Sequence, residues 1–141
     1  MSSGAGPGRA RIYALVAAGS ALGALARWAL ALAAGDGVVG AWPWGTFVAN
    51  IAGSALIGWA AGLVARRRGP VASLSGQLLL MTGFCGGFTT FSAFALEVLA
   101  QMQAGHSGLA LAYVASSVPL WVGAAWAGYR VGAQGRWGSA R

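Results

Sequence analysis

The sequence predicts an all-α integral membrane protein with four transmembrane helices. Of its 141 residues, 57% are hydrophobic and 8% are charged, whereas about 25% of the residues of a soluble domain are charged. Four apolar runs follow one another, each long enough for the roughly 20 residues that cross a bilayer core. We expect one domain over residues 1–141, with spans at about 12–34, 45–65, 71–96 and 108–129 and with loose ends at 1–8 and 132–141.

Charged and turn-forming residues mark the ends of these runs. The first run is longer than the ~7–15 residue apolar region of a signal peptide, so we expect a spanning helix. A glycine-rich loop with Asp36 and Pro43 follows it, and Arg66, Arg67 and Arg68 stop the second run. We expect the third run to end at Glu97 and residues 101–107 to form the last loop before the fourth run.

The third run contains an interruption that determines its interpretation. Residues 83–94 read Gly-Phe-Cys-Gly-Gly-Phe-Thr-Thr-Phe-Ser-Ala-Phe, which places helix-breaking glycines and hydroxyl groups in an uncharged apolar stretch. Backbone groups freed at membrane depth are tolerated only where protein, water or an ion satisfies them. Transporters use broken helices in this way to present carbonyls to a cation. We therefore predict that the third helix is broken near its middle, beside an ion or a pore.

The arginines predict the orientation in the membrane. All nine cationic side chains are Arg, and the net charge is +7. With four spans, both termini and the loop after the second span lie on one side, which carries Arg9, Arg11, Arg66, Arg67, Arg68, Arg130, Arg136 and Arg141. The positive-inside rule then predicts that both termini lie in the cytoplasm. We expect a multi-pass protein of the inner (plasma) membrane. These arginines lie at the ends of apolar runs, where they meet lipid headgroups, and this argues against nucleic-acid binding.

The residues do not favour an enzyme. The sequence contains no Ser/His/Asp or Cys/His constellation, no metal-ligand cluster and no phosphate-binding glycine loop after a strand. His106 stands alone in a predicted loop, and Cys85 is the single cysteine. We expect Cys85 to be a small packing residue.

Three motifs together resemble the Fluc (CrcB) family of fluoride channels. They are the interrupted stretch 83–94, Gly-Thr-Phe-Val-Ala-Asn-Ile-Ala-Gly at 45–53 and Gly-Ala-Leu-Ala-Arg-Trp at 23–28. The resemblance covers all four helices in order. It implies an antiparallel dimer of four-helix subunits with two fluoride pathways and a central, structural Na⁺ that is not transported. The function that it implies is passive export of cytoplasmic fluoride, which lowers fluoride toxicity.

The resemblance also assigns the ion site. The carbonyls of Gly86 and Thr89 would hold the Na⁺ at the break, with the partner chain completing the shell. A hard cation prefers oxygen ligands, which agrees with this assignment. The alternative is that the glycines only permit tight packing and that the threonine hydroxyls bond back to their own helix.

The family's fluoride pathway maps onto side chains of three helices. Phe91 and Phe94 lie on one helical face, and the positive edges of their rings can face an anion. The amide of Asn50 can donate to an anion or can instead form an interhelical hydrogen bond. Further hydroxyl donors that could form a polar track are Thr90, Ser92, Tyr113 and Ser117. Arg27 matches an arginine near the pore vestibule, where it would attract anions or anchor a helix end. We expect Glu97 to form a structural cap or pair.

The chain departs from the family pattern at Ala93 and Ala95, where hydroxyl residues are common, so one donor is missing from the track. Two other classes stay open: a small multidrug exporter, which needs a membrane-embedded carboxylate that the first three runs lack, and a non-conducting membrane assembly subunit. Because the arginine distribution is one-sided, we expect the antiparallel partner to be a paralogue of opposite charge bias. A homodimer is the alternative.

Overall fold

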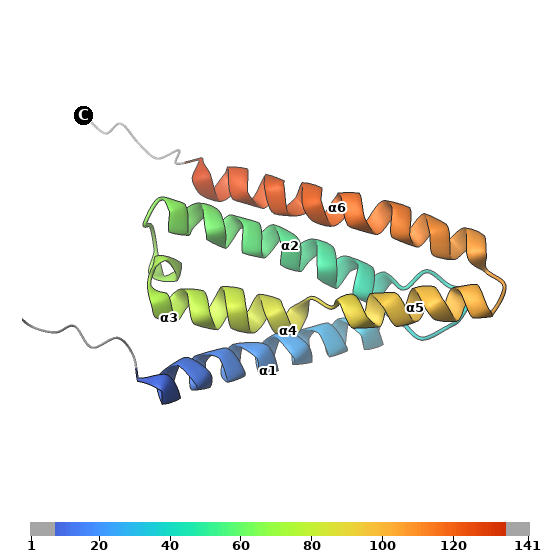
Figure 1. Ribbon diagram of the computed structural model, residues 1–141, viewed down its shortest axis with the longest axis horizontal. Helices are drawn as coiled ribbons and strands as arrows, with labels where there is room; N and C mark the ends of the chain where they lie inside the picture. The colour runs from blue at the N-terminus through green and yellow to red at the C-terminus, as the bar shows by residue number, and fades with distance from the viewer. Residues whose placement is uncertain (1–7, 135–141) are drawn as a thin grey trace, which may run out of the picture.

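Four long helices form the protein, as the sequence predicts (Figure 1). The computed structural model describes residues 8–134. Three of the helices are continuous: α1 (Arg9–Ala34), α2 (Trp44–Ala65) and α6 (Ser107–Ala133). The remaining spanning segment, Leu74–Gln103, is composite. All four are long and apolar enough to cross a membrane, and no strand occurs between residues 8 and 134.

The composite helix changes its geometry several times along its length. A 3₁₀ turn, η1 (Pro70–Ala72), leads into α3 (Leu74–Gly76) and a π-helical segment, η2 (Gln77–Cys85). A single turn of α-helix, α4 (Gly86–Phe88), precedes the break at Thr89 and Thr90, after which α5 (Phe91–Gln103) completes the span. The predicted break is therefore present, and it follows a π-helical segment that the sequence analysis did not anticipate.

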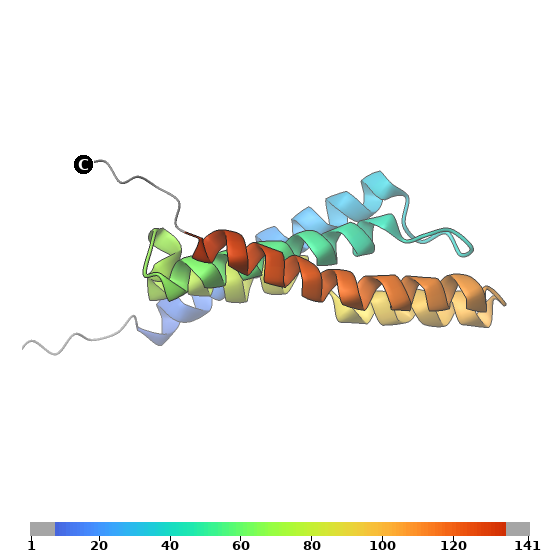
Figure 2. The ribbon, with the colours of Figure 1, turned by 90° about the horizontal axis from the view of Figure 1, so that it is seen from above.

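The helices pack in two main pairs. α2 lies between α6 and the composite helix, and α1 lies along the other side of η2 and α4 (Figure 1). Seen from above, α1 crosses the bundle obliquely while α5 and α6 run side by side (Figure 2). Both ends of the described chain lie at the same end of the bundle, and the loops at 35–43 and 104–106 lie at the opposite end.

Glycines allow the close approach of both pairs. A Cβ added at Gly19 or Gly23 of α1 would collide with backbone atoms of the composite helix. A Cβ added at Gly58 or Gly62 of α2 would meet the backbone of α6 at Ala125 and Gly132. Helix association in lipid depends on such close van der Waals packing, since lipid tails are as apolar as the side chains.

The helices extend further than the apolar runs indicate. α5 continues past Glu97 to Gln103, so the prediction that Glu97 ends this helix and that the last loop starts at residue 101 is wrong. The helix continues because Glu97 turns inward to hydrogen-bond partners and the residues after it are good helix formers. α1 already begins at Arg9, and α6 reaches Ala133, two residues into the expected loose end. The rest of the expected loose ends, 1–7 and 135–141, lies outside the described residues.

Two side chains hold the loop at residues 35–43 in place. Both carboxylate oxygens of Asp36 accept hydrogen bonds, from the backbone N–H groups of Gly45 and Thr46 at 2.9 Å each. A carboxylate is favourable there because the first turn of a helix carries unpaired N–H groups and partial positive charge. The buried Gln101 of α5 accepts from the N–H of Gly40 at 2.9 Å and donates to the carbonyl of Ala41 at 2.8 Å.

The tight contact of α1 with the composite helix predicts the effect of adding one methyl group. In Gly23→Ala, the new Cβ would meet the carbonyl of Phe84 and lie 2.7 Å from the amide nitrogen of Phe88. We expect a loss of roughly 1–3 kcal/mol in the free energy of unfolding, the usual cost of overpacking. The measurement is the thermal stability of the purified protein in detergent. Gly123→Ala is the matched control, because nothing lies within 4 Å of its added Cβ; equal stability of the two variants would contradict the prediction.

Candidate functional site

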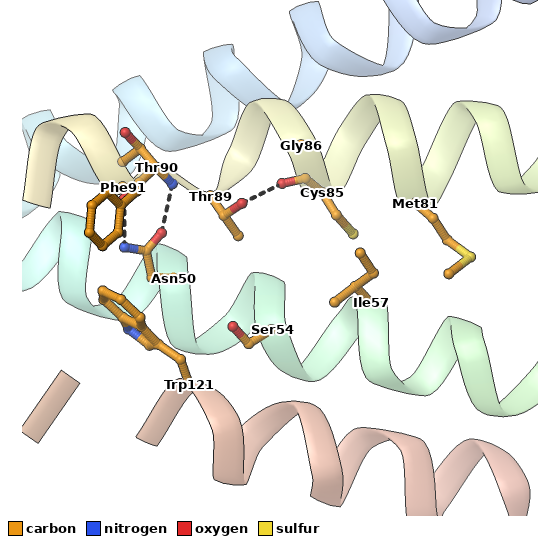
Figure 3. A pocket seen from close by; sticks show the side chains of 10 residues that line it. All are labelled: Asn50, Ser54, Ile57, Met81, Cys85, Gly86, Thr89, Thr90, Phe91 and Trp121. Carbon is orange, nitrogen blue, oxygen red and sulfur yellow. Dashed lines mark hydrogen bonds between the residues drawn. The ribbon is translucent and has the colours of Figure 1, made fainter. Parts of the chain in front are cut away.

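A pocket of about 300 Å³ lies beside the break in the composite helix (Figure 3). Its wall is formed by α2, by η2 and α4, by the break itself, by Phe91 of α5 and by Trp121 of α6. Asn50, Phe91 and Trp121 gather at one end of the pocket, and Met81 lies at the other end (Figure 3). The pocket therefore combines the polar groups of the break, Asn50 and Ser54 with a mainly apolar remainder.

The two threonines form the break, and the glycines do not. Thr89 has φ −85° and ψ 154°, and Thr90 has φ −150° and ψ 125°, so both are extended. Gly86 retains helical angles, φ −64° and ψ −34°. A Cβ at Gly87 would collide with the carbonyl of Ser20 on α1. The expectation that the glycines break the helix is thus wrong, since at Gly83 and Gly87 they permit contact with α1.

Asn50 holds the break from the neighbouring helix. Its Nδ2 donates to the carbonyl of Thr90 at 2.9 Å, and its Oδ1 accepts from the N–H of Thr90 at 2.7 Å. The side chain is buried, with 4% of its surface exposed. An amide in this position satisfies a backbone N–H and C=O that would otherwise be unpaired at membrane depth. The interhelical hydrogen bond that the sequence left as an alternative is therefore present, and one N–H of the amide remains for another acceptor.

At the break, two backbone N–H groups do not form the bonds of a continuous helix, in which they would donate to the carbonyls of Gly86 and Thr89. The N–H of Thr90 would donate to the carbonyl of Gly86 four residues earlier, but it donates to Asn50. The N–H of Ala93 would donate to the carbonyl of Thr89, but it donates to the hydroxyl of Thr90 at 3.1 Å. These are the two carbonyls that the resemblance to the fluoride channels assigns to a structural Na⁺.

Other groups at the break have mainly structural partners. The hydroxyl of Thr89 donates to the carbonyl of Cys85 at 2.8 Å, as the packing alternative predicts. The Nε of Arg27 donates to the carbonyl of Gly87 at 3.3 Å. Arg27 therefore anchors the end of α4, where helix carbonyls carry partial negative charge. Anion attraction by the remaining guanidinium N–H groups stays a prediction.

The two predicted pore phenylalanines have different environments. Their ring centroids are 5.7 Å apart, in agreement with a common helical face. Phe91 is 71% exposed and lines the pocket, whereas Phe94 is 4% exposed. The ring of Phe94 contacts Tyr113 and Trp121 of α6, each at a centroid distance of 4.9 Å.

The predicted hydroxyl donors divide into two groups. Tyr113 and Ser117 are fully buried on one face of α6. The hydroxyl of Tyr113 donates to Glu97 at 2.8 Å, and Thr46 donates to the other Glu97 oxygen at 2.6 Å, which confirms the structural pairing expected of Glu97. Thr90 and Ser92 lie at the start of α5 with their hydroxyl oxygens 3.2 Å apart, and Ser92 is exposed. The structure thus brings Asn50, Thr90 and Phe91 to the pocket, and Phe94, Tyr113 and Ser117 to the bundle interior.

Sequence reasoning missed several residues near these groups. Trp121 lines the pocket and packs on Phe94. Its spacing of four from Ser117 and eight from Tyr113, one face of a helix, was the available signal. Asp36 was read only as a loop residue, because it lies eight residues before the start of α2 and capping residues are recognised in a sequence only immediately before a helix.

Four apolar helices, a break in the third and polar groups around that break define a multi-pass membrane protein of the channel or transporter class. A family model described as "CrcB-like protein, Camphor Resistance (CrcB)" matches residues 14–129. The chain belongs to this family.

Curated relatives match across most of the bundle. "Fluoride-specific ion channel FluC 1" of Bradyrhizobium diazoefficiens is 42% identical over 120 residues, which cover 85% of this chain and 83% of the relative. "Fluoride-specific ion channel FluC" of Agrobacterium fabrum is 41% identical, over 84% of this chain and 94% of the relative. "Fluoride-specific ion channel FluC 1" of Mycolicibacterium paratuberculosis is 48% identical, over 77% and 80%.

The bonds between Asn50 and Thr90 predict a local effect of substitution. Asn50→Ala leaves the N–H and C=O of Thr90 without these partners, at a cost of about 1–3 kcal/mol for each unpaired group. We expect amide hydrogen exchange at Thr90 to become roughly 10- to 100-fold faster. Ser54→Ala, one turn further along α2 in the same pocket, is the matched control and should leave this rate unchanged. An unaltered rate at Thr90 in Asn50→Ala would show that the amide does not hold the break.

Proposed function

We propose that this chain is a subunit of a fluoride-specific channel that lets fluoride leave the cytoplasm passively. The observation that carries the proposal is that most of the bundle matches the family model, broken helix included, and matches relatives named as fluoride-specific ion channels. HF crosses membranes and dissociates inside the cell. A path for the anion, driven by the inside-negative potential, then relieves the load without ATP.

The side chains at the break suit a small, strongly hydrated anion. A selective path has to replace the water of the ion with protein donors. The second Nδ2–H of Asn50 and the hydroxyl of Ser117 can donate. The C–H edges of Phe94 and Phe91 can face the ion without a fixed charge that would trap it. Glu97 contributes no donor, and the proton of the Tyr113 hydroxyl is already committed to it.

The residues at the break also fit a structural Na⁺. The carbonyls of Gly86 and Thr89 lose their helical donors to Asn50 and to the Thr90 hydroxyl. Carbonyl oxygens without a cluster of carboxylates suit a permanently held monovalent cation. Gly86 is exposed, and nothing lies within 4 Å of a Cβ placed on it, so a partner chain has room to complete the shell. When bound, the cation would stabilise the broken backbone by satisfying these oxygens.

The rival function, a small multidrug exporter, is not favoured. The sequence argument that it lacks a membrane-embedded carboxylate nevertheless fails. Because α5 runs to Gln103, Glu97 lies inside the third spanning helix, and the premise that the first three spans lack a carboxylate is wrong. Both oxygens of Glu97 accept hydrogen bonds from Thr46 and Tyr113, which suits a fixed structural group. The family membership and the names of the relatives also favour the channel.

Fluoride efflux from liposomes tests the proposed function. We expect rapid efflux from liposomes that hold the conducting assembly in sodium buffer. Efflux should fall at least tenfold when the assembly is purified and reconstituted with a large organic cation in place of Na⁺, because the break then lacks its ion. Phe94→Ile should abolish efflux, since it removes the aromatic edges from the buried path. Phe84→Ile is the matched control, because Phe84 stacks on Phe88 and does not line the pocket. Efflux that ignores both Na⁺ and Phe94→Ile would contradict the proposal.

We propose further that the working assembly is an antiparallel dimer with an oppositely oriented paralogue. In the described part of the chain, Arg9, Arg11, Arg66, Arg67, Arg68 and Arg130 lie at one end of the bundle. The opposite end carries Asp36 and His106. The positive-inside rule favours a single orientation for so asymmetric a chain, with both termini in the cytoplasm. A homodimer is the alternative, and it requires insertion in both orientations.

Topology reporters on the C-terminus distinguish these two assemblies. A green fluorescent protein fusion should fluoresce and an alkaline phosphatase fusion should be inactive, because the arginine-rich end stays in the cytoplasm. In a variant with Arg66, Arg67 and Arg68 changed to Ser, part of the phosphatase signal should appear. Equal activity of both reporters in the unaltered chain would support the homodimer and exclude an obligate paralogue.

A further inference from the structure

Three buried polar atoms between residues 8 and 134 lack a hydrogen-bond partner: the indole Nε1 of Trp42, the hydroxyl of Ser117 and the indole Nε1 of Trp121. Such a group costs about 1–3 kcal/mol when it is left unpaired in an interior. An indole nitrogen can only donate, and a hydroxyl can donate. Three buried hydrogen-bond donors in the described part of the chain therefore have no acceptor within the protein.

Trp42 and Trp121 are the two ends of one continuous column of aromatic rings, and Ser117 lies beside it. Trp42 contacts Tyr113 at a centroid distance of 5.3 Å. Tyr113 contacts Phe94, and Phe94 contacts Trp121, each at 4.9 Å. Ser117 lies on α6 midway between Tyr113 and Trp121, one helical turn from each. The unpartnered donors therefore occur at both ends of the column and along its middle.

Each end of the column opens on a cavity. Trp121 lines the pocket of about 300 Å³ at the break, beside Asn50 and Phe91 (Figure 3). Trp42 lines a second cavity, of about 70 Å³, under the loop at residues 35–43. An ion that passed from one cavity to the other along this column would meet the indole N–H of Trp121, the hydroxyl of Ser117 and the indole N–H of Trp42.

The two carboxylates near the column bond to other donors. Asp36 and Glu97 both line the smaller cavity. Both oxygens of Asp36 accept from backbone N–H groups, and both oxygens of Glu97 accept from Thr46 and Tyr113. Neither carboxylate accepts a hydrogen bond from Trp42 or Trp121. Their negative charge also disfavours prolonged residence of an anion in the smaller cavity, which suits a point of exit better than a trap.

We propose that the indole N–H groups of Trp42 and Trp121 are anion donors at the two ends of a buried conduction path, with Ser117 between them. The ligand is a small monovalent anion that has shed water, and this inference rests on the proposed fluoride function. Trp121 receives the ion from the pocket at the break. Trp42 receives it at the end of the bundle that carries the loop at residues 35–43.

Tryptophan-to-phenylalanine substitutions in the conducting assembly test the path. Trp121→Phe and Trp42→Phe keep a ring in the column and remove the N–H group, and we expect each to lower fluoride efflux about tenfold or more. Trp126→Phe is the matched control on the same helix, because Trp126 is 62% exposed and lines neither cavity, and it should leave efflux unchanged. Efflux is the readout that decides, because Trp121→Phe also removes ring volume that packs on Phe94 and lowers stability whatever the role of the N–H group. A purely structural indole would leave efflux intact.

Indole resonances of the ¹⁵N-labelled chain report binding directly. The signals of Trp42 and Trp121 are assigned by their loss in the two variants. Sodium fluoride should shift both signals, equal sodium chloride should not, and the Trp126 signal should respond to neither salt. Efflux with unaltered indole signals and normal rates in both variants would overturn the inference and leave the proposed function standing. If the unaltered assembly shows neither efflux nor a fluoride-dependent shift, both fail.

Discussion

The pairing of the Asn50 amide with the backbone of Thr90 is the interaction on which the rest of the site depends. It lets two extended residues interrupt a helix at membrane depth, where unpaired backbone groups would otherwise be prohibitive. Because it takes the N–H of Thr90, it frees the carbonyl of Gly86. The same break turns the Thr90 hydroxyl toward the N–H of Ala93, which frees the carbonyl of Thr89. The Asn50 side chain on α2 thus stabilises the break that leaves these two carbonyls without their helical donors.

Contacts with the neighbouring helices hold the broken segment in position. Glycines bring the backbone of α1 against the composite helix and the backbone of α2 against α6. Arg27 binds the carbonyl of Gly87 from α1, and Glu97 joins α5 to α2 and α6 through Thr46 and Tyr113. Polar groups inside the bundle are therefore mostly paired. The unpaired donors concentrate along the column from Trp42 to Trp121, where a transported anion would need them.

The sequence predicted the number of helices well because each span is a long apolar run with few charges, bounded by arginines or turn residues. It also placed the break within residues 83–94. It could not assign the break to the threonines, because glycine is both a helix breaker and a packing residue and the choice depends on α1. The extent of α5 was misjudged because Glu97 was treated as facing water, whereas its partners lie on two other helices. Trp121 was missed since a tryptophan in a membrane helix ordinarily packs or faces the interface.

An experimental structure of the purified assembly in sodium fluoride, at a resolution that shows bound ions, tests the role of the break most directly. We expect Thr90 to be extended with its N–H bonded to Asn50, and a cation in contact with the carbonyl oxygens of Gly86 and Thr89. A third helix that runs unbroken through residues 86–94, with the N–H of Thr90 bonded to Gly86 and no cation beside it, would contradict both the ion site and the pathway built on it.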